Sequence, residues 1–379
     1  MNYAERSLEL HKKYTGKLEI ASKVSLETMD DLAVAYTPGV AEPCNVIAKD
    51  PSQAMSLTMK GNTVAVVTDG SAVLGLGNIG PLAALPVMEG KAILYKKFAG
   101  IDAIPICLAT QDTEEIISVI KMIAPTFGGI HLEDISAPRC FEIEERLNRE
   151  LDMPVMHDDQ HGTAVVVLAG LLNALKVVGK KLSDVRIVIS GAGAAGNAIA
   201  WILHEAGATK ISVLDSKGVI GIARDGMNQW KDKLVRAIAD TATQSGMNLA
   251  DAVRGADVFI GVSQANLLSQ EMVKSMAGKA IVFAMANPVP EIMPDDARVA
   301  GAVVVASGRS DFPNQVNNVL AYPGMFLGAL RNGVKHFSLP IKVNAAIALA
   351  SLLPEPTAEK ILPSVFEADV AEAIARVIV

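Results

Sequence analysis

Short apolar runs separated by longer amphipathic segments recur along most of this chain. In its first part we predict strands at residues 63–68, 91–95, 103–109 and 129–132. Segments between them, such as 112–123 and 137–151, carry apolar residues at helical spacing. Because strands alternate with helices, the pattern predicts a mostly parallel sheet with helices on its faces. Residues 1–30 are predicted to form one or two charged helices.

The polar segment 153–162 interrupts this pattern, and a helix of small residues is predicted after it at 163–178. A second series of strands is then predicted at residues 185–190, 210–214, 258–261, 280–284 and 303–306. We therefore predict an α/β fold, with an N-terminal domain at 1–161 and a doubly wound domain at 162–325. The segment 326–379 is predicted to be helical, broken at prolines, and to pack back on the first domain.

Composition narrows the class of protein. Half of the 379 residues are hydrophobic and 20% are charged, which is typical of a globular chain and excludes disorder. The longest apolar stretch, 164–172, is far shorter than the roughly 20 residues that a membrane-spanning helix needs. The N-terminus lacks an apolar signal-peptide core, so a cytoplasmic location is predicted. The net charge of −7, without a basic stripe, disfavours nucleic acid and membrane surfaces as partners.

Two further expectations follow from composition. The high apolar content and the N-terminal helices favour a homodimer. The three cysteines, Cys44, Cys107 and Cys140, show no paired spacing and are predicted to be reduced and mostly buried.

A glycine-rich turn, GAGAAG at 191–196, joins the strand predicted at 185–190 to a helix of small residues. In such a turn the first glycine permits a tight bend, the second lets backbone approach a pyrophosphate, and the third lets helix and strand pack closely. The phosphates lie at the positive end of the helix. This context predicts a Rossmann-type domain that binds a nicotinamide dinucleotide. The predicted contacts are Gly191, Gly193, Ala194, Ala195 and Gly196.

Asp215 ends the next predicted strand, 24 positions after Gly191. A carboxylate at this place is suited to bind the ribose hydroxyls of NAD. An aspartate at a turn or a helix N-cap is the structural alternative. Ser216 and Lys217 follow directly and could instead bind the 2′-phosphate of NADP. The sequence therefore leaves NAD and NADP open.

Two acidic pairs lie where apolar strands end. Glu133 and Asp134 follow one predicted strand, and Asp158 and Asp159 lie in the polar run HDDQHG. Adjacent carboxylates repel each other unless a cation binds them, and hard oxygen ligands suit Mg²⁺ or Mn²⁺. The first pair alone would be read as a helix N-terminus, but two pairs at two strand ends favour a metal. Zinc is disfavoured, because neither a cysteine nor tight histidine spacing supports it.

Lys91 and Tyr36 are candidate proton-transfer residues. Lys91 stands at the start of the predicted strand 91–95, where partial desolvation would lower its pKa and make it a possible base. Taken alone, it would be read as a surface lysine that extends its amine into water. Tyr36 lies on the Pro-Gly turn of AYTPGV, where a tyrosine usually packs as an amphipathic ring.

Taken together, these fragments resemble the malic enzymes of the short prokaryotic type. The matching segments occur in family order: AYTPGVAEPC (35–44), VTDGSAVLGLGNIGPLAALPVMEGKAILYKKFAGIDA (67–103), HLEDI (131–135), HDDQHGTA (157–164), SGAGAAGNAIA (190–200), VLDSKG (213–218), ANPVPE (286–291) and FPNQVNNVLAYPG (312–324). As a set, YTPGVA with GLGNIG and HDDQHGTA with LEDI are highly specific. The resemblance implies an N-terminal substrate and metal domain, a Rossmann-type dinucleotide domain and C-terminal helices. It further implies oxidative decarboxylation of L-malate to pyruvate and CO₂ with NAD or NADP and Mg²⁺ or Mn²⁺.

The resemblance also implies roles for single residues. Lys91 is implied to be the general base that takes the proton of the malate hydroxyl, and Tyr36 the general acid that protonates C3 of enolpyruvate. Asp158 is implied to be the carboxylate beside Lys91. The implied metal ligands are Glu133, Asp134 and Asp159. Asn287 is implied to contact malate and the nicotinamide side, and Asn318 to contact malate.

One position departs from the larger malic enzymes, which carry an arginine that pairs with a substrate carboxylate where this chain has Ala72. Ser71, the metal or a group from a second subunit are the alternatives for that role. The same residues are also compatible with an oxaloacetate decarboxylase or with a malolactic enzyme that retains NAD and releases lactate. The intact dinucleotide turn disfavours the decarboxylase. A non-catalytic dinucleotide sensor is disfavoured, because every catalytic position is filled.

Overall fold

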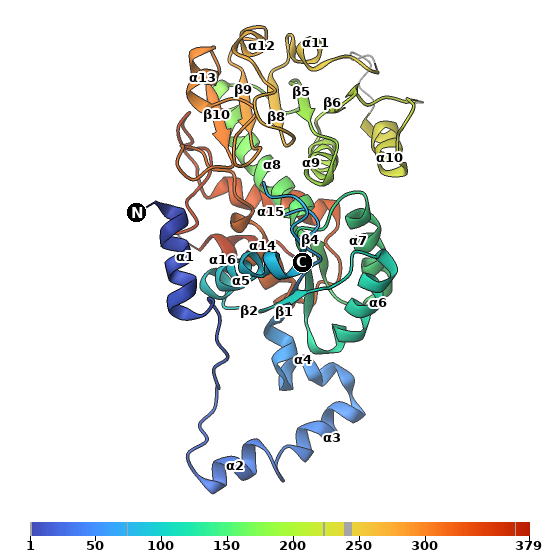
Figure 1. The fold of residues 1–379 in the computed structure, drawn as a ribbon, viewed down its shortest axis with the longest axis vertical. Coiled ribbons are helices and arrows are strands. Elements are labelled where there is room, and N and C mark those ends of the chain that lie inside the picture. The colour runs from blue at the N-terminus through green and yellow to red at the C-terminus, as the bar shows by residue number, and fades with distance from the viewer. Residues whose placement is uncertain (1, 74, 223, 239–244, 368) are drawn as a thin grey trace.

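The computed structural model describes residues 2–73, 75–222, 224–238, 245–367 and 369–379. After helix α1 (Tyr3–Tyr14), residues 15–58 form an arm that reaches away from the rest of the chain (Figure 1). The arm runs extended and then forms the helices α2 (Met29–Ala35), α3 (Ala41–Lys49) and α4 (Ala54–Leu57), with the 3-10 turn η1 (Pro51–Gln53).

The arm has no interior of its own. None of residues 2–60 is buried. Cys44 is exposed on α3, so the prediction of mostly buried cysteines is wrong for this residue, whereas Cys140 is buried. Lys17 and Lys23 tie the extended part of the arm to the body, through the Pro86 carbonyl oxygen at 2.6 Å and the Asp102 carboxylate at 3.2 Å.

The first sheet consists of four parallel strands in the order β2-β1-β3-β4. They are β1 (Thr63–Thr68), β2 (Asp102–Cys107), β3 (Gly129–Leu132) and β4 (Val155–His157). Its helices and turns are η2 (Met59–Asn62), α5 (Gly80–Ala99), α6 (Thr113–Ile123), η3 (Ala124–Thr126) and α7 (Arg139–Glu150). The predicted strands 63–68, 103–109 and 129–132 are confirmed. Sequence reasoning missed β4, because three residues inside a polar segment are too few to show a period.

Residues 91–95 belong to helix α5, so the strand predicted there is wrong. A short apolar run beside Gly90 has the local pattern of a strand, and that pattern alone cannot separate a buried strand from part of a buried helix. The buried residues of α5 have helical spacing: Ala84, Met88, Ala92 and Tyr95. Lys91 therefore lies on the buried face of the helix, one turn after Met88 and one turn before Tyr95.

The second sheet has the strand order β10-β9-β8-β5-β6-β7. Its strands are β5 (Arg186–Ser190), β6 (Lys210–Asp215), β7 (Gly218–Val219), β8 (Val258–Gly261), β9 (Ile281–Ala284) and β10 (Val304–Ser307), all parallel except β7. Its helices are α9 (Ala194–Glu205), α10 (Gln229–Ile238), α11 (Leu249–Val253), α12 (Gln270–Lys274) and α13 (Pro294–Val299). The order reverses between β5 and β8, and doubly wound sheets bind ligands at such a reversal.

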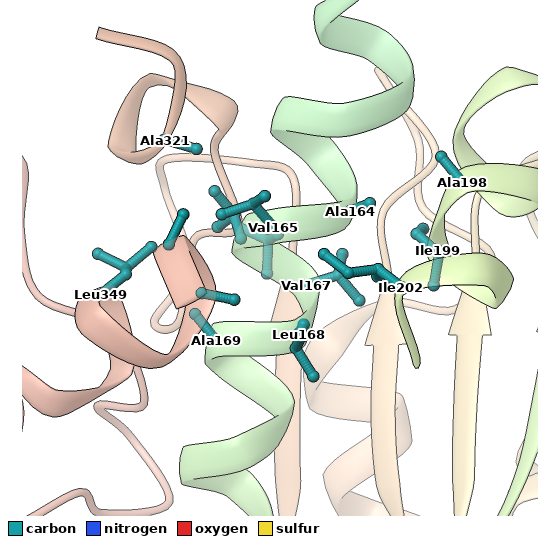
Figure 2. Packing of buried hydrophobic residues seen from close by; sticks show 14 of the residues in the cluster. Ala164, Val165, Val167, Leu168, Ala169, Ala198, Ile199, Ile202, Ala321 and Leu349 are labelled. Carbon is teal, nitrogen blue, oxygen red and sulfur yellow. The ribbon is translucent and has the colours of Figure 1, made fainter. Parts of the chain in front are cut away.

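Helix α8 (Asp158–Val178) joins the two sheets. It begins before the predicted helix 163–178 and runs through the position predicted as a domain boundary, between residues 161 and 162. Within the described residues it is the one helix long and apolar enough to cross a membrane, yet 72% of its apolar window is buried inside the molecule. In Figure 2, Val167 points toward Ile199 and Ile202 of α9.

The C-terminal segment contacts helix α5 beside the first sheet. Its elements are η4 (Asn318–Leu320), α14 (Tyr322–Asn332), α15 (Leu339–Ser351) and α16 (Val370–Ala375). Helices α14 and α16 contact α5, and α15 contacts α8. The rings of Tyr322 and Phe326 on α14 lie edge-on to Tyr95 of α5, with centroids 4.8 Å and 5.8 Å apart. This segment therefore covers the helix that carries Lys91.

Candidate active site

Lys91 is held between two carboxylates. Its Nζ donates a hydrogen bond to Asp158 Oδ2 at 2.6 Å and lies 3.0 Å from Glu133 Oε1. The side chain of Lys91 is 11% exposed and that of Asp158 is fully buried. Asp158 opens α8 directly after β4, and Glu133 follows the neighbouring strand β3. The carboxyl ends of two adjacent parallel strands thus bring both carboxylates to α5.

These carboxylates determine the charge of Lys91. Burial alone would lower the pKa of Lys91, but Asp158 and Glu133 outweigh burial and raise it well above its usual value. The prediction of a lowered pKa is therefore wrong, because the local sequence shows the desolvation and not the distant anions. In this arrangement Lys91 is an ammonium, and it can act as a base only after the carboxylate charge has been offset.

The acidic cluster suits a divalent cation. Glu133, Asp134 and Asp159 each place a carboxylate oxygen within 4.8 Å of the others. Asp134 Oδ2 is buried and has no hydrogen-bond partner among the described residues. Burial raises the pKa of Asp134 to about 9, with Glu133 and Asp159 adding to the rise, and raises that of Glu133 to about 7. Crowded carboxylates with an orphaned buried oxygen fit Mg²⁺ or Mn²⁺, and the ligand role of these residues stays a prediction.

The glycines of the 191–196 turn have distinct geometries. Gly191 has a φ of +120°, and a Cβ on it would lie 2.7 Å from the backbone carbonyl oxygen of Val262, which follows β8. A Cβ on Gly196 would lie 1.7 Å from the Gly191 carbonyl oxygen, so helix and turn approach closely only without a side chain. Gly193 has open space around its Cβ position and caps α9, whose first turn begins with Ala194 and Ala195. The space at Gly193 is where backbone can approach a pyrophosphate.

Asp215 lines the same cleft, which has a volume of about 860 Å³. Its Oδ2 accepts hydrogen bonds from Lys231 Nζ at 2.7 Å and from the Arg224 guanidinium, and its Oδ1 accepts from the Lys217 backbone N–H at 2.9 Å. Burial opposes its ionisation, but these partners hold the pKa of Asp215 well below its usual value. Sequence reasoning missed Arg224 and Lys231, because no local pattern links them to Asp215.

The cleft lies between the domain that contains the first sheet and the domain that contains the second. Ala137, Pro138 and Phe141, at the start of α7, contribute to its lining together with the glycine turn. The ring of Phe141 lies 5.4 Å from that of Trp230 on α10, between ring centroids. The first domain therefore helps to form the dinucleotide cleft, which the sequence did not indicate.

Asn287 and Asn318 also lie at the junction of the two domains. Asn287 is in the exposed loop after β9, and a Cβ on Gly75 of the first domain would lie 3.0 Å from its carbonyl oxygen. Asn318 packs against α8 at Gly162, where a Cβ would lie 1.8 Å from Asp158 Oδ1 and 3.3 Å from Asn318 Cβ. Their predicted contacts with malate stay predictions.

Comparison with known proteins places this architecture in a family. Residues 15–148 match the model of the malic enzyme N-terminal domain, and residues 160–379 match that of the malic enzyme NAD binding domain. The chain belongs to the malic enzyme family. The resemblance and the α/β fold predicted from the sequence are thereby confirmed.

Individual malic enzymes are similar to this chain over its full length. It is 55% identical to the bifunctional malic/malolactic enzyme of Bacillus subtilis, over 100% of this chain and 92% of that protein. It is 54% identical to the NAD-dependent malic enzyme of Geobacillus stearothermophilus, over 100% of this chain and 79% of that protein. The crystal structure of the NAD-dependent malic enzyme of Thermotoga maritima superposes with a TM-score of 0.94 at 47% identity, covering 98% of both chains.

The predicted acid of this malic enzyme, Tyr36, is not brought to Lys91 within one chain. Tyr36 ends α2 and is 66% exposed. Figure 1 shows α2 at the far end of the arm, well away from β4 and from α5, the helix that carries Lys91. The motif YTPGVA carries the resemblance, but it does not indicate where the arm lies. Within one chain, Tyr36 and Lys91 thus lie on separate parts of the structure.

The position of the missing arginine lies beside the acidic cluster. The Ala72 backbone N–H donates to the Asp134 carbonyl oxygen at 2.9 Å. Ser71 Oγ donates to Asp69 Oδ1 at 2.5 Å and accepts from Arg139 Nη2 at 3.0 Å. Because this hydroxyl is already engaged, Ser71 is a poor substitute for the arginine. The cation and a group from a second subunit remain as the alternatives.

Proposed function

We propose that this chain catalyses the oxidative decarboxylation of L-malate to pyruvate and CO₂, with NAD or NADP and with Mg²⁺ or Mn²⁺ at the acidic cluster. The observation that carries this proposal is the position of Lys91, which contacts both Asp158 and the candidate ligand Glu133. Its amine adjoins the oxygens toward which a cation would draw a hydroxy acid. A cytoplasmic location, and no nucleic-acid or membrane partner, belong to the same proposal.

The side chains of the site divide the work. When bound, a divalent cation would polarise the substrate oxygens and offset the negative charge of the carboxylates that contact Lys91, and the oxidised dinucleotide would accept a hydride. Lys91, once neutral, takes the proton of the substrate hydroxyl. Asp158 lies 2.6 Å away and is the carboxylate through which that proton can pass. Proton transfer by a positioned side chain typically contributes about 10²–10⁴-fold.

The charges around Asp215 are compatible with either dinucleotide. Its carboxylate can accept the ribose hydroxyls of NAD. Arg224 and Lys231 place two positive charges beside it, which a 2′-phosphate of NADP would attract. Binding of NADP would exchange the Asp215 carboxylate for the phosphate as the partner of Arg224.

The proton that completes pyruvate requires a second copy of the chain in this proposal. The arm exposes large apolar side chains such as Ile20 at 99% and Met29 at 78%. Large apolar side chains exposed along one segment favour a subunit interface there. A homodimer in which each arm packs on the other chain would cover this surface and bring Tyr36 of one copy to Lys91 of the other. Tyr36 would then protonate C3 of enolpyruvate.

Initial rates with L-malate test the proposal. Purified protein with Mn²⁺ should reduce NAD or NADP in the presence of L-malate and release CO₂. Pyruvate formed from oxaloacetate, without any absorbance change at the nicotinamide band with malate, would instead show a decarboxylase.

A malolactic activity is the second candidate, because the Bacillus subtilis relative is named a bifunctional malic/malolactic enzyme. The same reaction mixture separates the two activities. Lactate accumulating without net NADH would show that the dinucleotide is retained and reoxidised, whereas pyruvate in equal amount to NADH supports the malic reaction.

A further inference from the structure

We infer that His131 and Tyr95 position Glu133 for the divalent cation through a buried chain of hydrogen bonds. His131 Nε2 lies 2.6 Å from Glu133 Oε2, and His131 Nδ1 lies 2.8 Å from the Tyr95 hydroxyl. His131 and Tyr95 are both 0% exposed. The inference rests on the metal site proposed above and adds residues that hold a ligand in place.

The direction of each bond follows from the chemistry of the groups. Glu133 must be ionised to bind a cation, and an ionised carboxylate only accepts hydrogen bonds, so His131 donates its Nε2–H to Glu133. Nδ1 of the neutral ring is then an acceptor, and the Tyr95 hydroxyl donates its hydrogen bond to it. Every polar atom along the chain is therefore matched, and the orientation of the imidazole ring is determined at both nitrogens.

Together with Lys91, these hydrogen bonds form a ring of contacts that begins and ends on α5. Tyr95 lies one helical turn after Lys91. Lys91 contacts Glu133 Oε1 at 3.0 Å. His131, which is hydrogen bonded to Tyr95, contacts Glu133 Oε2. Helix α5 thus holds both oxygens of the Glu133 carboxylate, directly at one oxygen and through the imidazole at the other. Rotation of the Glu133 carboxylate would break one of the two contacts.

Packing keeps the imidazole in this place. Its ring lies edge-on to Tyr322, with centroids 5.2 Å apart, and 6.0 Å from Phe326. Both aromatic rings come from α14, so the histidine lies between the C-terminal segment and Tyr95 of α5. His131 lies on β3 and Glu133 directly follows the strand, with its backbone N–H still bonded to the Val67 carbonyl oxygen of β1, so two positions apart their side chains point to the same face.

A direct ligand role for His131 does not fit the same contacts. His131, Glu133 and Asp158 also offer ligand atoms within 4.8 Å of one another. Both nitrogens of His131 are already hydrogen bonded, and the Lys91 ammonium contacts the other two residues of that group. A cation there would have to displace this ammonium. His131 is therefore a positioning residue, and groups that orient a ligating carboxylate typically contribute about 10–100-fold in metal affinity.

Titration of Mn²⁺, followed by the electron paramagnetic resonance signal of the free ion, tests the inference without an activity assay. His131→Phe keeps a ring and removes both nitrogens, and should weaken Mn²⁺ binding by about 10–100-fold. His131→Gln can still donate an amide N–H toward Glu133 and should recover most of the affinity. Tyr95→Phe removes only the hydroxyl and should weaken binding by about fivefold. NADH binding at the glycine turn should stay unchanged in all three variants, which shows that they fold.

Asp134→Asn separates the inference from the function proposed above. It should abolish Mn²⁺ binding, because Asp134 is a proposed ligand. If it does so while His131→Phe binds Mn²⁺ as tightly as the unaltered protein, the positioning role is overturned and the metal site stands. If His131→Gln binds as weakly as His131→Phe with NADH binding intact, the hydrogen bond is not what matters, and the inference is equally overturned. Unaltered Mn²⁺ affinity in Asp134→Asn would overturn the metal site, and the inference with it.

Discussion

The acidic site and the N-terminal arm are built in opposite ways. In the site, charged side chains from α5, β3 and α8 are buried against one another, and Lys91 contacts two carboxylates at once. In the arm, no residue is buried and the motif residue Tyr36 is 66% exposed. One chain therefore fixes the geometry of the proposed base and the proposed ligands, whereas the proposed acid lies on an exposed arm.

Removing the Lys91 side chain should have the largest effect on activity. Lys91→Ala deletes the proposed base and should lower kcat for malate oxidation by about 10²–10⁴-fold, measured as NADH formation at saturating Mn²⁺. Lys97→Ala is the matched control, because Lys97 is exposed on the same helix. Near-normal rates in Lys91→Ala would contradict its assignment as the base.

The affinity for Mn²⁺ should rise with pH. Without a cation, the pKa of Asp134 is about 9 and that of Glu133 about 7, so both carboxyls carry protons that a cation must displace. For each displaced proton the apparent affinity increases by up to about tenfold per pH unit, until the carboxyls are ionised in the free protein. Calorimetry in two buffers of different ionisation enthalpy measures the released protons. An affinity independent of pH with no proton release would contradict the crowded cluster.

A smaller effect, on NADP binding more than on NAD binding, is expected in the second domain. Arg224→Ala removes a positive charge beside Asp215 and should weaken NADP binding by about tenfold more than NAD binding, measured by fluorescence titration of the reduced forms. Arg254→Ala is the control, because Arg254 is an exposed arginine of the same domain that pairs with Asp251. An equal loss for both dinucleotides would mean that Arg224 only stabilises the fold.

Sequence reasoning succeeded where the chemistry is local. The glycine turn needs its residues in order, so Gly191, Gly193 and Gly196 could be placed before the structure was known. The pair Glu133–Asp134 can be placed because it follows the predicted strand 129–132, whereas Asp158 and Asp159 stand out only as acids in a polar run, because β4 is too short to predict. The catalytic and ligand roles were implied by resemblance, and they remain predictions.

Sequence reasoning failed where distant segments determine the outcome. The strand predicted at 91–95 is wrong, because a run of five residues does not reveal the 20-residue helix that contains it. The pKa of Lys91 was predicted to fall, because its partners Glu133 and Asp158 lie 42 and 67 positions away. His131 was read only as part of HLEDI, since its partner Tyr95 is on another element. A helical reading of Met88, Lys91 and Tyr95 would have found the buried face.

Subunit complementation tests the two-chain account of the site most directly. Tyr36→Phe and Lys91→Ala homodimers should each have little activity. A heterodimer of the two variants, purified through two different tags, contains one site with both native residues if Tyr36 acts on the other chain. The account predicts that this heterodimer has about half the activity of the unaltered dimer. An inactive heterodimer that still binds Mn²⁺ and NADH would contradict it.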